Sequence, residues 1–412
     1  MQDFSNYSRI EEDMDLTMDN LLKSCKIECM ERRILLVSVN DRSYTSYRYF
    51  AKQLSDALQQ KGCRIGWCRL EPGEGQDTHA WGKALFQAQA FHADAVVDFN
   101  SFLPKISVDG KCLPEVFEAP FYNYVLDHPI YHKKALEAKL SDYRCICVDE
   151  LHEVYIKKYY PHIRSVFTNP IPGSVGRNAE HPFIKRKKRI LFCGTYEEPE
   201  RYLQLMRKLP KKMADACMEL GQQMLEDSDG MMGDALNPGN AEYCFLADAY
   251  ARHERRKRII RTLLHAGLPI DLYGNGWEAL HQECQGKSNA MIHDSIMYSD
   301  YVNKLGEYQI ALNIMPRFVL GSHDRITCAM YNKVAVLTDE NAYVHAHYDS
   351  GLNHGAVVAA FSVNDGEKLC ELGEKLLKDT AWTEQLALRG TEYGKRYHTW
   401  DALAERILAD MG

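Results

Sequence analysis

Short apolar runs alternate with helical stretches twice along this chain, on either side of a segment rich in proline and glycine. The first run, Arg33–Val39, fits a strand buried on both faces, and the helical stretch Tyr47–Lys61 follows it and stops before Gly62. Arg64–Leu70 can then return as a strand. This alternation is typical of a doubly wound α/β domain, in which helices cover a parallel sheet.

The alternation continues to about residue 172 and then restarts. In the first half it predicts further strands at Ala95–Phe99, Phe121–Leu126 and Arg144–Val148. It predicts helices there at His79–Phe91 and Ile130–Leu140. In the second half it predicts strands at Arg189–Thr195, Pro269–Gly276, Gln309–Met315 and Val334–Thr338, a long helical segment after the first of these, and helices from near Asp324 and over Asp365–Ala409. The sequence therefore predicts two α/β domains with a ligand-binding cleft between them.

Thr168–Gly173 is dense in proline and glycine and precedes a polar stretch, which marks a boundary between domains. We expect a polar leader at 1–30, a first domain at 31–172, a linker at 173–188 and a second domain at 189–390. The C-terminal helix, 391–412, could pack back on the first domain. The helical segment 197–243 is longer than a link requires, and could shape acceptor binding, contact a partner or only cover the sheet.

Composition excludes several classes of protein. The 412 residues carry 50 basic and 57 acidic side chains, which gives a net charge of −7. This balance does not indicate a nucleic-acid-binding protein. The 13 cysteines form no CxxC motif and are expected to be reduced thiols, as in the cytoplasm. The acidic start is unlike a secretion signal, and no apolar run approaches the roughly 18 residues of a membrane span. We expect a cytoplasmic protein of undetermined oligomeric state.

Asp127 and His128 follow the predicted strand Phe121–Leu126, where a loop would face the cleft. A histidine beside a carboxylate is suited to accept a proton from an attacking hydroxyl, so either residue is a candidate catalytic base. Alternatively, Asp127 caps a helix that starts at Pro129, and the two roles are compatible. His128 and His132 stand four apart without a third ligand at a telling spacing, which argues against a metal.

Two segments of the second half could bind phosphate. Gly321–Arg325 lies between a strand and a helix, where Arg325 would add its charge to the free N–H groups of the helix N-terminus. In the alternative, Asp324 caps the helix and Arg325 is solvated. Gly274 and Gly276 follow a strand and could let a nucleotide approach the backbone. Because the third glycine of a dinucleotide fingerprint is missing, a tight turn is an equal alternative.

Charged runs give weaker signals. Arg252–Arg258 and Lys185–Arg189 lack interleaved aromatic residues, so the first is expected to be a solvated helix face from which one arginine could still reach the cleft. The triplets Asp13–Asp15 and Asp227–Asp229 would suit a metal–diphosphate site, but neither ends a strand. Gly286–Ser288 ends like a phosphate loop but lacks its first glycine. The sequence therefore predicts no bound metal.

Several segments of the second half fall in the order and spacing of a known family. They are Ala251–Arg258, Asp271–Trp277, Ile310–Met315, His323–Arg325, Ala329–Met330 and Val336–Asp339. They resemble two-domain glycosyltransferases of the GT-B fold, in particular the group-1 branch that includes the spore-maturation-type transferases. In the first half only Asp127–Pro129 and the opening strand are similar. The resemblance implies two Rossmann-like domains facing across a cleft.

The resemblance also implies an activity: metal-independent transfer of a sugar from a nucleotide-diphosphate sugar, expected to be a UDP-sugar, with no other cofactor. Arg325 would face the diphosphate, and Gly194 and Thr195 would approach it by backbone. The remaining donor contacts would come from Tyr273, Gly274, Asn275 and Gly276 around the nucleoside, and from Ser322, His323 and Asp324. Asp127 or His128 would act on the acceptor, a protein or a polysaccharide precursor.

This sequence departs from the family at two positions. Many retaining relatives carry two glutamates eight positions apart where Leu320 and Cys328 stand here, so the stereochemical outcome stays open. Two other functions therefore remain open. A nucleotide-sugar epimerase of the same fold would convert its substrate without an acceptor, and a non-catalytic nucleotide-binding or partner subunit would bind at most the nucleotide.

Overall fold

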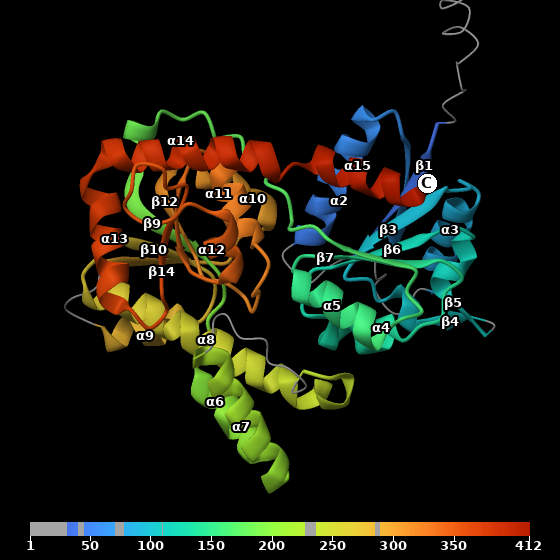
Figure 1. The fold of residues 1–412 in the computed structure, drawn as a ribbon, viewed down its shortest axis with the longest axis horizontal. Coiled ribbons are helices and arrows are strands. Elements are labelled where there is room, and N and C mark those ends of the chain that lie inside the picture. Colours follow the sequence, from blue (N-terminus) through green and yellow to red (C-terminus); the bar gives the residue numbers. More distant parts are fainter. Residues whose placement is uncertain (1–30, 40–44, 71–77, 109, 227–235, 285–288) are drawn as a thin grey trace, which may run out of the picture.

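The computed structural model describes residues 31–39, 45–70, 78–108, 110–226, 236–284 and 289–412, which form two α/β domains (Figure 1). Each domain is built on a six-stranded sheet whose neighbouring strands are all parallel. Parallel sheets need helices on both faces, which is why their strands read as continuous apolar runs. The predicted α/β architecture is confirmed.

The first sheet has the strand order β2-β1-β3-β6-β7-β8. Its strands are β1 (Arg33–Val39), β2 (Arg64–Leu70), β3 (Ala95–Phe99), β6 (Phe121–Val125), β7 (Tyr143–Cys147) and β8 (Ser165–Thr168). The helices of this domain are α2 (Ser46–Gln60), α3 (Thr78–Gln89), α4 (Lys133–Leu136) and α5 (Glu150–Tyr159), beside a small hairpin of β4 (Ser107–Val108) and β5 (Lys111–Cys112). Every residue of the central strands β3, β6 and β7 is buried.

The second sheet has the order β11-β10-β9-β12-β13-β14. Its strands are β9 (Lys187–Cys193), β10 (Ile270–Tyr273), β11 (Ala290–His293), β12 (Tyr308–Asn313), β13 (Ala335–Asp339) and β14 (Ala359–Phe361). Its shorter helices are α9 (Trp277–Glu283), α10 (Tyr298–Leu305), α11 (Asp324–Tyr331) and α12 (Ala342–His347). In both sheets the strand order reverses beside the first strand of the domain, and such switch points open a crevice at the carboxyl ends of the strands.

Three helices fill the predicted long helical segment: α6 (Pro199–Arg207), α7 (Lys211–Glu226) and α8 (Ala241–His265). Figure 1 shows α6 and α7 projecting away from the second sheet, with α8 running back from them. The predicted helix over Ile130–Leu140 is wrong in extent. A 3₁₀ turn at Pro129–His132 and the single turn α4 replace it, since the His128 ring accepts the Ile130 N–H and opens a tight turn there.

The chain passes between the domains twice. The first passage leads from β8 to β9 and is packed rather than free: Asn332, at the end of α11, accepts the Gly176 N–H and donates to the Ser174 carbonyl. Residues 187 and 188, which were expected in the linker 173–188, already belong to β9. The second passage leads from α14 (Thr380–Tyr397), which follows α13 (Gly366–Lys378), into α15 (Trp400–Met411).

Helix α15 lies against α2 of the first domain, whereas α14, which precedes it, lies over the second domain (Figure 1). Trp400, Leu403 and Ile407 are buried in one apolar cluster with residues of α2 and of the first sheet. At the end of α15, Asp410 accepts hydrogen bonds from Tyr122 and Arg144. Helix α15 therefore packs on the first domain, whereas residues 391–397 of the expected C-terminal helix 391–412 form the end of α14, where Thr391 donates to the Met330 carbonyl of α11.

Asp98, in β3, makes the stability of the first domain depend on pH. Its side chain is buried, one oxygen accepts the Phe99 N–H at 2.8 Å, and Oδ2 has no hydrogen-bond partner among the described residues. Burial raises the pKa of Asp98 from 3.8 to about 7, although Ser101 and, to a smaller extent, the Phe99 amide oppose the shift. The folded chain thus holds this proton at pH values where the unfolded chain has lost it.

We expect Asp98→Asn, which imitates the protonated acid, to remove this dependence. In the parent, the raised pKa stabilises the fold at low pH, and the stabilisation is lost as pH rises from about 4 to 7. The variant should therefore gain stability relative to the parent as pH rises, by on the order of a few kcal/mol at pH 8. Urea unfolding at several pH values measures the difference. Parallel stability curves for both proteins would show that folding does not shift the pKa of Asp98.

Candidate functional site

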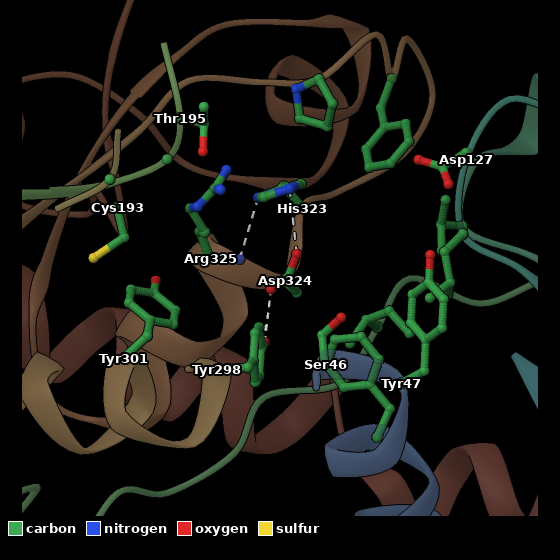
Figure 2. A pocket seen from close by; sticks show the side chains of 18 of the residues that line it. Ser46, Tyr47, Asp127, Cys193, Thr195, Tyr298, Tyr301, His323, Asp324 and Arg325 are labelled. Atoms are coloured by element: carbon green, nitrogen blue, oxygen red, sulfur yellow. Dashed lines mark hydrogen bonds and ion pairs between the residues drawn. The ribbon is translucent and has the colours of Figure 1, made fainter. Parts of the chain in front are cut away.

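A pocket of about 380 Å³ lies between the domains, at the carboxyl ends of both sheets. The first domain contributes the start of α2 and the loops after β6 and β7, and the second contributes the ends of β9 and β10, one face of α8 and the 316–325 loop. Figure 2 shows Thr195 and Arg325 on one side of the pocket and Asp127 and Tyr47 on the other. The two sides come from different domains, so the pocket is complete only when the domains are together.

Three arginines line the second-domain side: Arg252, Arg256 and Arg325. Arg252 pairs with the buried carboxylate of Asp248. Arg256 donates to the Thr195 carbonyl, and the Arg325 guanidinium lies 5.8 Å from the centre of the Phe192 ring. Neither of these two has a carboxylate within 4 Å in the described part of the chain.

Arg256 has no carboxylate partner within 4 Å among the described residues, and its pKa is lowered. Burial, followed by the positive charges of Arg325 and Arg252, lowers the pKa of Arg256 to about 9. Two like charges held side by side without an anion cost free energy, which a bound anion would relieve. The pocket is therefore built to receive negative charge between Arg256 and Arg325.

The start of α11 aims Arg325 into this place. His323 is the N-cap: its Nδ1 accepts the Arg325 N–H at 3.3 Å, and its Nε2 lies 3.2 Å from Oδ1 of Asp324. Burial lowers the pKa of His323 to about 3, so the ring is neutral and its one proton sits on Nε2, toward Asp324. The helix is thus capped by His323, and the interpretation in which Asp324 caps it is wrong.

Asp324 is held from its other side as well. Its Oδ2 accepts the Tyr298 hydroxyl at 2.6 Å. The Tyr298 ring packs edge-on against Phe50 of α2, with 4.9 Å between ring centres, so this contact reaches the first domain. Ser322, also in the pocket wall, shares a hydrogen bond with Tyr348 at 2.8 Å. The 322–325 segment is therefore held in place by contacts with α10, Tyr348 and the first domain.

The glycines after β9 and β10 bring two turns together. Gly274 has a φ of 137°, and a Cβ there would lie 2.5 Å from the Gly194 carbonyl oxygen. Gly194 itself donates to the Tyr273 carbonyl and accepts from the Trp277 indole, both at 2.8 Å. Gly194, Thr195, Tyr273 and Gly274 line the pocket.

Asn275 and Gly276 do not line the pocket. The Asn275 carbonyl accepts the Tyr196 N–H at 2.9 Å, and a Cβ on Gly276 would lie 2.1 Å from the Tyr196 carbonyl oxygen. Gly276 also has a φ of 90°, which favours glycine. For these two residues the tight-turn interpretation describes what the structure shows, whereas Tyr273 and Gly274 face the pocket.

Asp127 is at the mouth of the pocket, on the first-domain side, with 55% of its side chain exposed. Its Oδ2 accepts the Asn100 amide at 2.8 Å and lies 3.9 Å from Nε2 of His132. Desolvation in the cleft favours the neutral acid, but His132, Arg252 and Asn100 together outweigh it and hold the pKa of Asp127 below its usual value. Asp127 is therefore an ionised acceptor aimed at the pocket.

His128 points away from this position. Its Nδ1 accepts the Ile130 N–H at 3.1 Å, and its ring packs edge-on against His152 and Tyr155 at 4.8 and 5.0 Å between centres. Burial, then the charges of His152 and Arg317, hold the pKa of His128 well below its usual value. His128 does not line the pocket. Of the two candidate bases, only Asp127 faces it, and the capping role expected of Asp127 belongs to His128.

The basic run of α8 is not a wholly solvated face: one of its arginines was expected to be able to reach the cleft, and two do. Arg252 and Arg256 are one helical turn apart and both line the pocket, while Arg255 is buried behind them and donates to the Met224 carbonyl at 3.2 Å. The spacing of four was the available signal, because it places both side chains on one face. The sequence did not show that this face meets the cleft.

Within the described residues, no group of three or more histidine, cysteine or acidic side chains is arranged to hold a metal ion. Asp13–Asp15, Asp227–Asp229 and Gly286–Ser288 lie outside the residues that the structure describes. No helix in the described ranges combines the length and the apolar character that crossing a bilayer requires.

Comparison with known proteins places these features in a family context. Residues 252–409 match a family model described as glycosyl transferase-like, and no curated protein sequence matches the chain. Among solved structures, an α-glucosyltransferase in complex with UDP and a 13-mer DNA containing an HMU base is similar at a TM-score of 0.55 and 10% identity, covering 92% of this chain and 99% of that one.

Two further structures share the fold at 92% coverage of this chain and 97% of theirs, both with a TM-score of 0.51. They are a sucrose-phosphate synthase from Thermosynechococcus elongatus, 11% identical, and AviGT4, a glycosyltransferase involved in avilamycin A biosynthesis, 12% identical. Identities this low show the fold alone, which is GT-B. Together with the domain match, this fold supports a glycosyltransferase enzyme, without distinguishing the spore-maturation branch.

Proposed function

We propose that this glycosyltransferase takes its sugar from a UDP-sugar, needs no metal ion, and transfers the sugar to a hydroxyl acceptor held on the first-domain side of the pocket. The observation that carries the proposal is the pair Arg256 and Arg325, two guanidinium groups without a carboxylate partner among the described residues, facing one pocket. A nucleotide diphosphate is the anion that a glycosyl donor brings.

The diphosphate would lie between these arginines, next to Gly194, where the lack of a side chain lets the ligand approach the backbone. As the glycosidic bond to the diphosphate breaks, negative charge accumulates on the leaving oxygen. Fixed positive groups in a water-poor site stabilise that charge. Arg256, Arg325 and the N-terminal end of α11 supply this stabilisation from the chain itself.

Asp127 would act on the acceptor. It is ionised, lies across the pocket from Arg325, and belongs to the other domain. A carboxylate in this position accepts the hydroxyl proton as the new bond to the sugar forms. The choice of UDP is supported by structural neighbours that were solved with UDP.

We expect UDP to raise the melting temperature of the protein more than GDP or ADP, equally with and without EDTA. At 100 times its dissociation constant a ligand adds about 2.7 kcal/mol of stability, which thermal shift detects. Incubation with UDP-sugars should then release UDP slowly to water and faster with an acceptor. Conversion of the nucleotide sugar without release of UDP would instead identify an epimerase, and no stabilisation by any nucleotide would refute the donor site.

A further inference from the structure

A carboxylate of the first domain holds the loop of the second domain that leads to the anion site. Asp149 follows β7 and is 1% exposed. Its Oδ1 accepts the Leu151 N–H at 2.7 Å and so caps α5. Its Oδ2 accepts two N–H groups of the other domain, those of Val319 and Leu320, at 2.7 and 2.9 Å.

The backbone around Asp149 continues this contact. The Glu150 N–H donates to the Leu320 carbonyl at 3.2 Å, and Asp149 and Gly321 form an antiparallel bridge. A Cβ on Gly321 would lie 2.4 Å from the Val148 carbonyl oxygen, so the close approach requires glycine there. We call this contact between residues 148–150 and 319–321 the interdomain seam.

The seam fixes the distance between the two sides of the pocket. Asn341 ties the same loop to its own domain, by donating to the carbonyls of Phe318 and Gly321 at 2.8 and 3.1 Å. Two residues after Gly321, the chain reaches His323 and the start of α11. The loop is thus fixed to the second domain by Asn341 and to the first by Asp149.

The negative charge of Asp149 is explained by the seam rather than by the helix cap. Asparagine caps a helix as well as aspartate does, because one oxygen suffices. Only a carboxylate offers a second oxygen that accepts two further N–H groups, and asparagine would present a donor there instead. Among the described residues Asp149 has no cationic partner within 4 Å, so these amides are what satisfies it.

We propose that Asp149 is a positioning residue, which holds the domains closed so that Asp127 faces the donor side of the pocket. The kinetic part of this inference rests on the proposed function, whereas the closure itself does not. Because Arg252, Arg256, Arg325 and Gly194 all belong to the second domain, the donor site stays intact when the seam opens. Loss of the seam should therefore separate catalysis from nucleotide binding.

The test is Asp149→Asn, whose carbonyl oxygen can still cap α5 while its amide group repels the two N–H groups of the seam. We expect kcat to fall about 10- to 100-fold, since small misplacements of reacting groups have effects of that size. The dissociation constant of UDP should change less than about threefold. The radius of gyration in solution, measured by X-ray scattering with UDP bound, should rise.

Two further variants make the result specific. Asp365→Asn replaces another capping aspartate, which bonds the Lys368 N–H at 2.9 Å on the exposed start of α13, and should change none of the three quantities. Gly321→Ala disrupts the seam from the opposite side while keeping the Asp149 carboxylate, because its Cβ would lie 2.4 Å from the Val148 carbonyl oxygen and 2.9 Å from Cβ of Asp149, and it should repeat the effects of Asp149→Asn. Thermal melts of each variant establish that the domains are folded.

Unchanged kcat and radius of gyration in Asp149→Asn would overturn the proposal. So would a loss of UDP affinity that parallels the loss of kcat at unchanged radius, because Asp149 would then act on the donor loop alone. If the parent protein shows no transfer but the radius still rises in both seam variants, the closure by Asp149 stands and the proposed function fails.

Discussion

Asp127→Asn is expected to lower turnover about 10²- to 10⁴-fold while leaving the affinity for UDP unchanged. The carboxylate faces the pocket from the first domain, and the amide keeps its size but cannot take up a proton. Steady-state rates with saturating acceptor, together with calorimetric titration of UDP, separate the two quantities. His132, Arg252 and Asn100 hold the pKa of Asp127 below its usual value, so lowering the pH from about 7 to 5 should not reduce the rate through this group.

Asp56→Asn is the matched control for this change. Asp56 is an aspartate of α2 in the same domain, where it pairs with Lys52 on the surface. Its replacement should leave both turnover and UDP affinity as they are. Full turnover in Asp127→Asn would mean that another group accepts the proton, and His132, 3.9 Å from Asp127, would be examined next.

Arg256→Ala and Arg325→Ala are each expected to weaken UDP binding about 10- to 100-fold. A hydrogen bond to a charged group is worth about 1.5–3 kcal/mol, and each 1.4 kcal/mol corresponds to a factor of ten. The two effects should not add fully, because removing one arginine relieves the repulsion that lowers the pKa of Arg256. Titration calorimetry of the two single variants and the double variant measures this coupling.

Arg258→Ala serves as the control on the same helix. Arg258 pairs with Glu254 at 3.0 Å and does not line the pocket. Its loss should leave UDP affinity unchanged, which distinguishes a specific contact from the general charge of α8. If Arg256→Ala and Arg325→Ala bind UDP as the parent does, the diphosphate lies elsewhere in the cleft.

The fold could be predicted because its central strands are buried on both faces and therefore read as apolar runs. Short edge strands lack that signal. β11 has one exposed residue and three that are only partly buried, and β14 has three residues in all, so neither strand was predicted. The helix expected over Ile130–Leu140 is replaced by a 3₁₀ turn, because the His128 ring accepts the Ile130 N–H. The pattern of apolar residues carries no information about such a side-chain hydrogen bond.

The candidate site could be predicted in part, and the residues that were missed share one physical cause. Nine of the twelve predicted site residues line the pocket, since strand ends and a helix start are local features. Arg256 and Asp149 were not predicted as site or positioning residues, because what decides their role is which part of the other elements packs against them. A charge run and a capping aspartate look the same in sequence wherever the helix is packed.

The two passages of the chain between the domains also bind each other. The Gly173 N–H donates to the His398 carbonyl at 3.1 Å, and the Trp400 indole donates to the Ser174 hydroxyl at 3.2 Å. Two chain passages that bind each other give the two domains a common pivot. The domains can turn about this pivot more easily than they can slide past each other. We therefore expect the cleft to open by a turn about this common pivot, which would move Asp127 along one arc relative to the second domain.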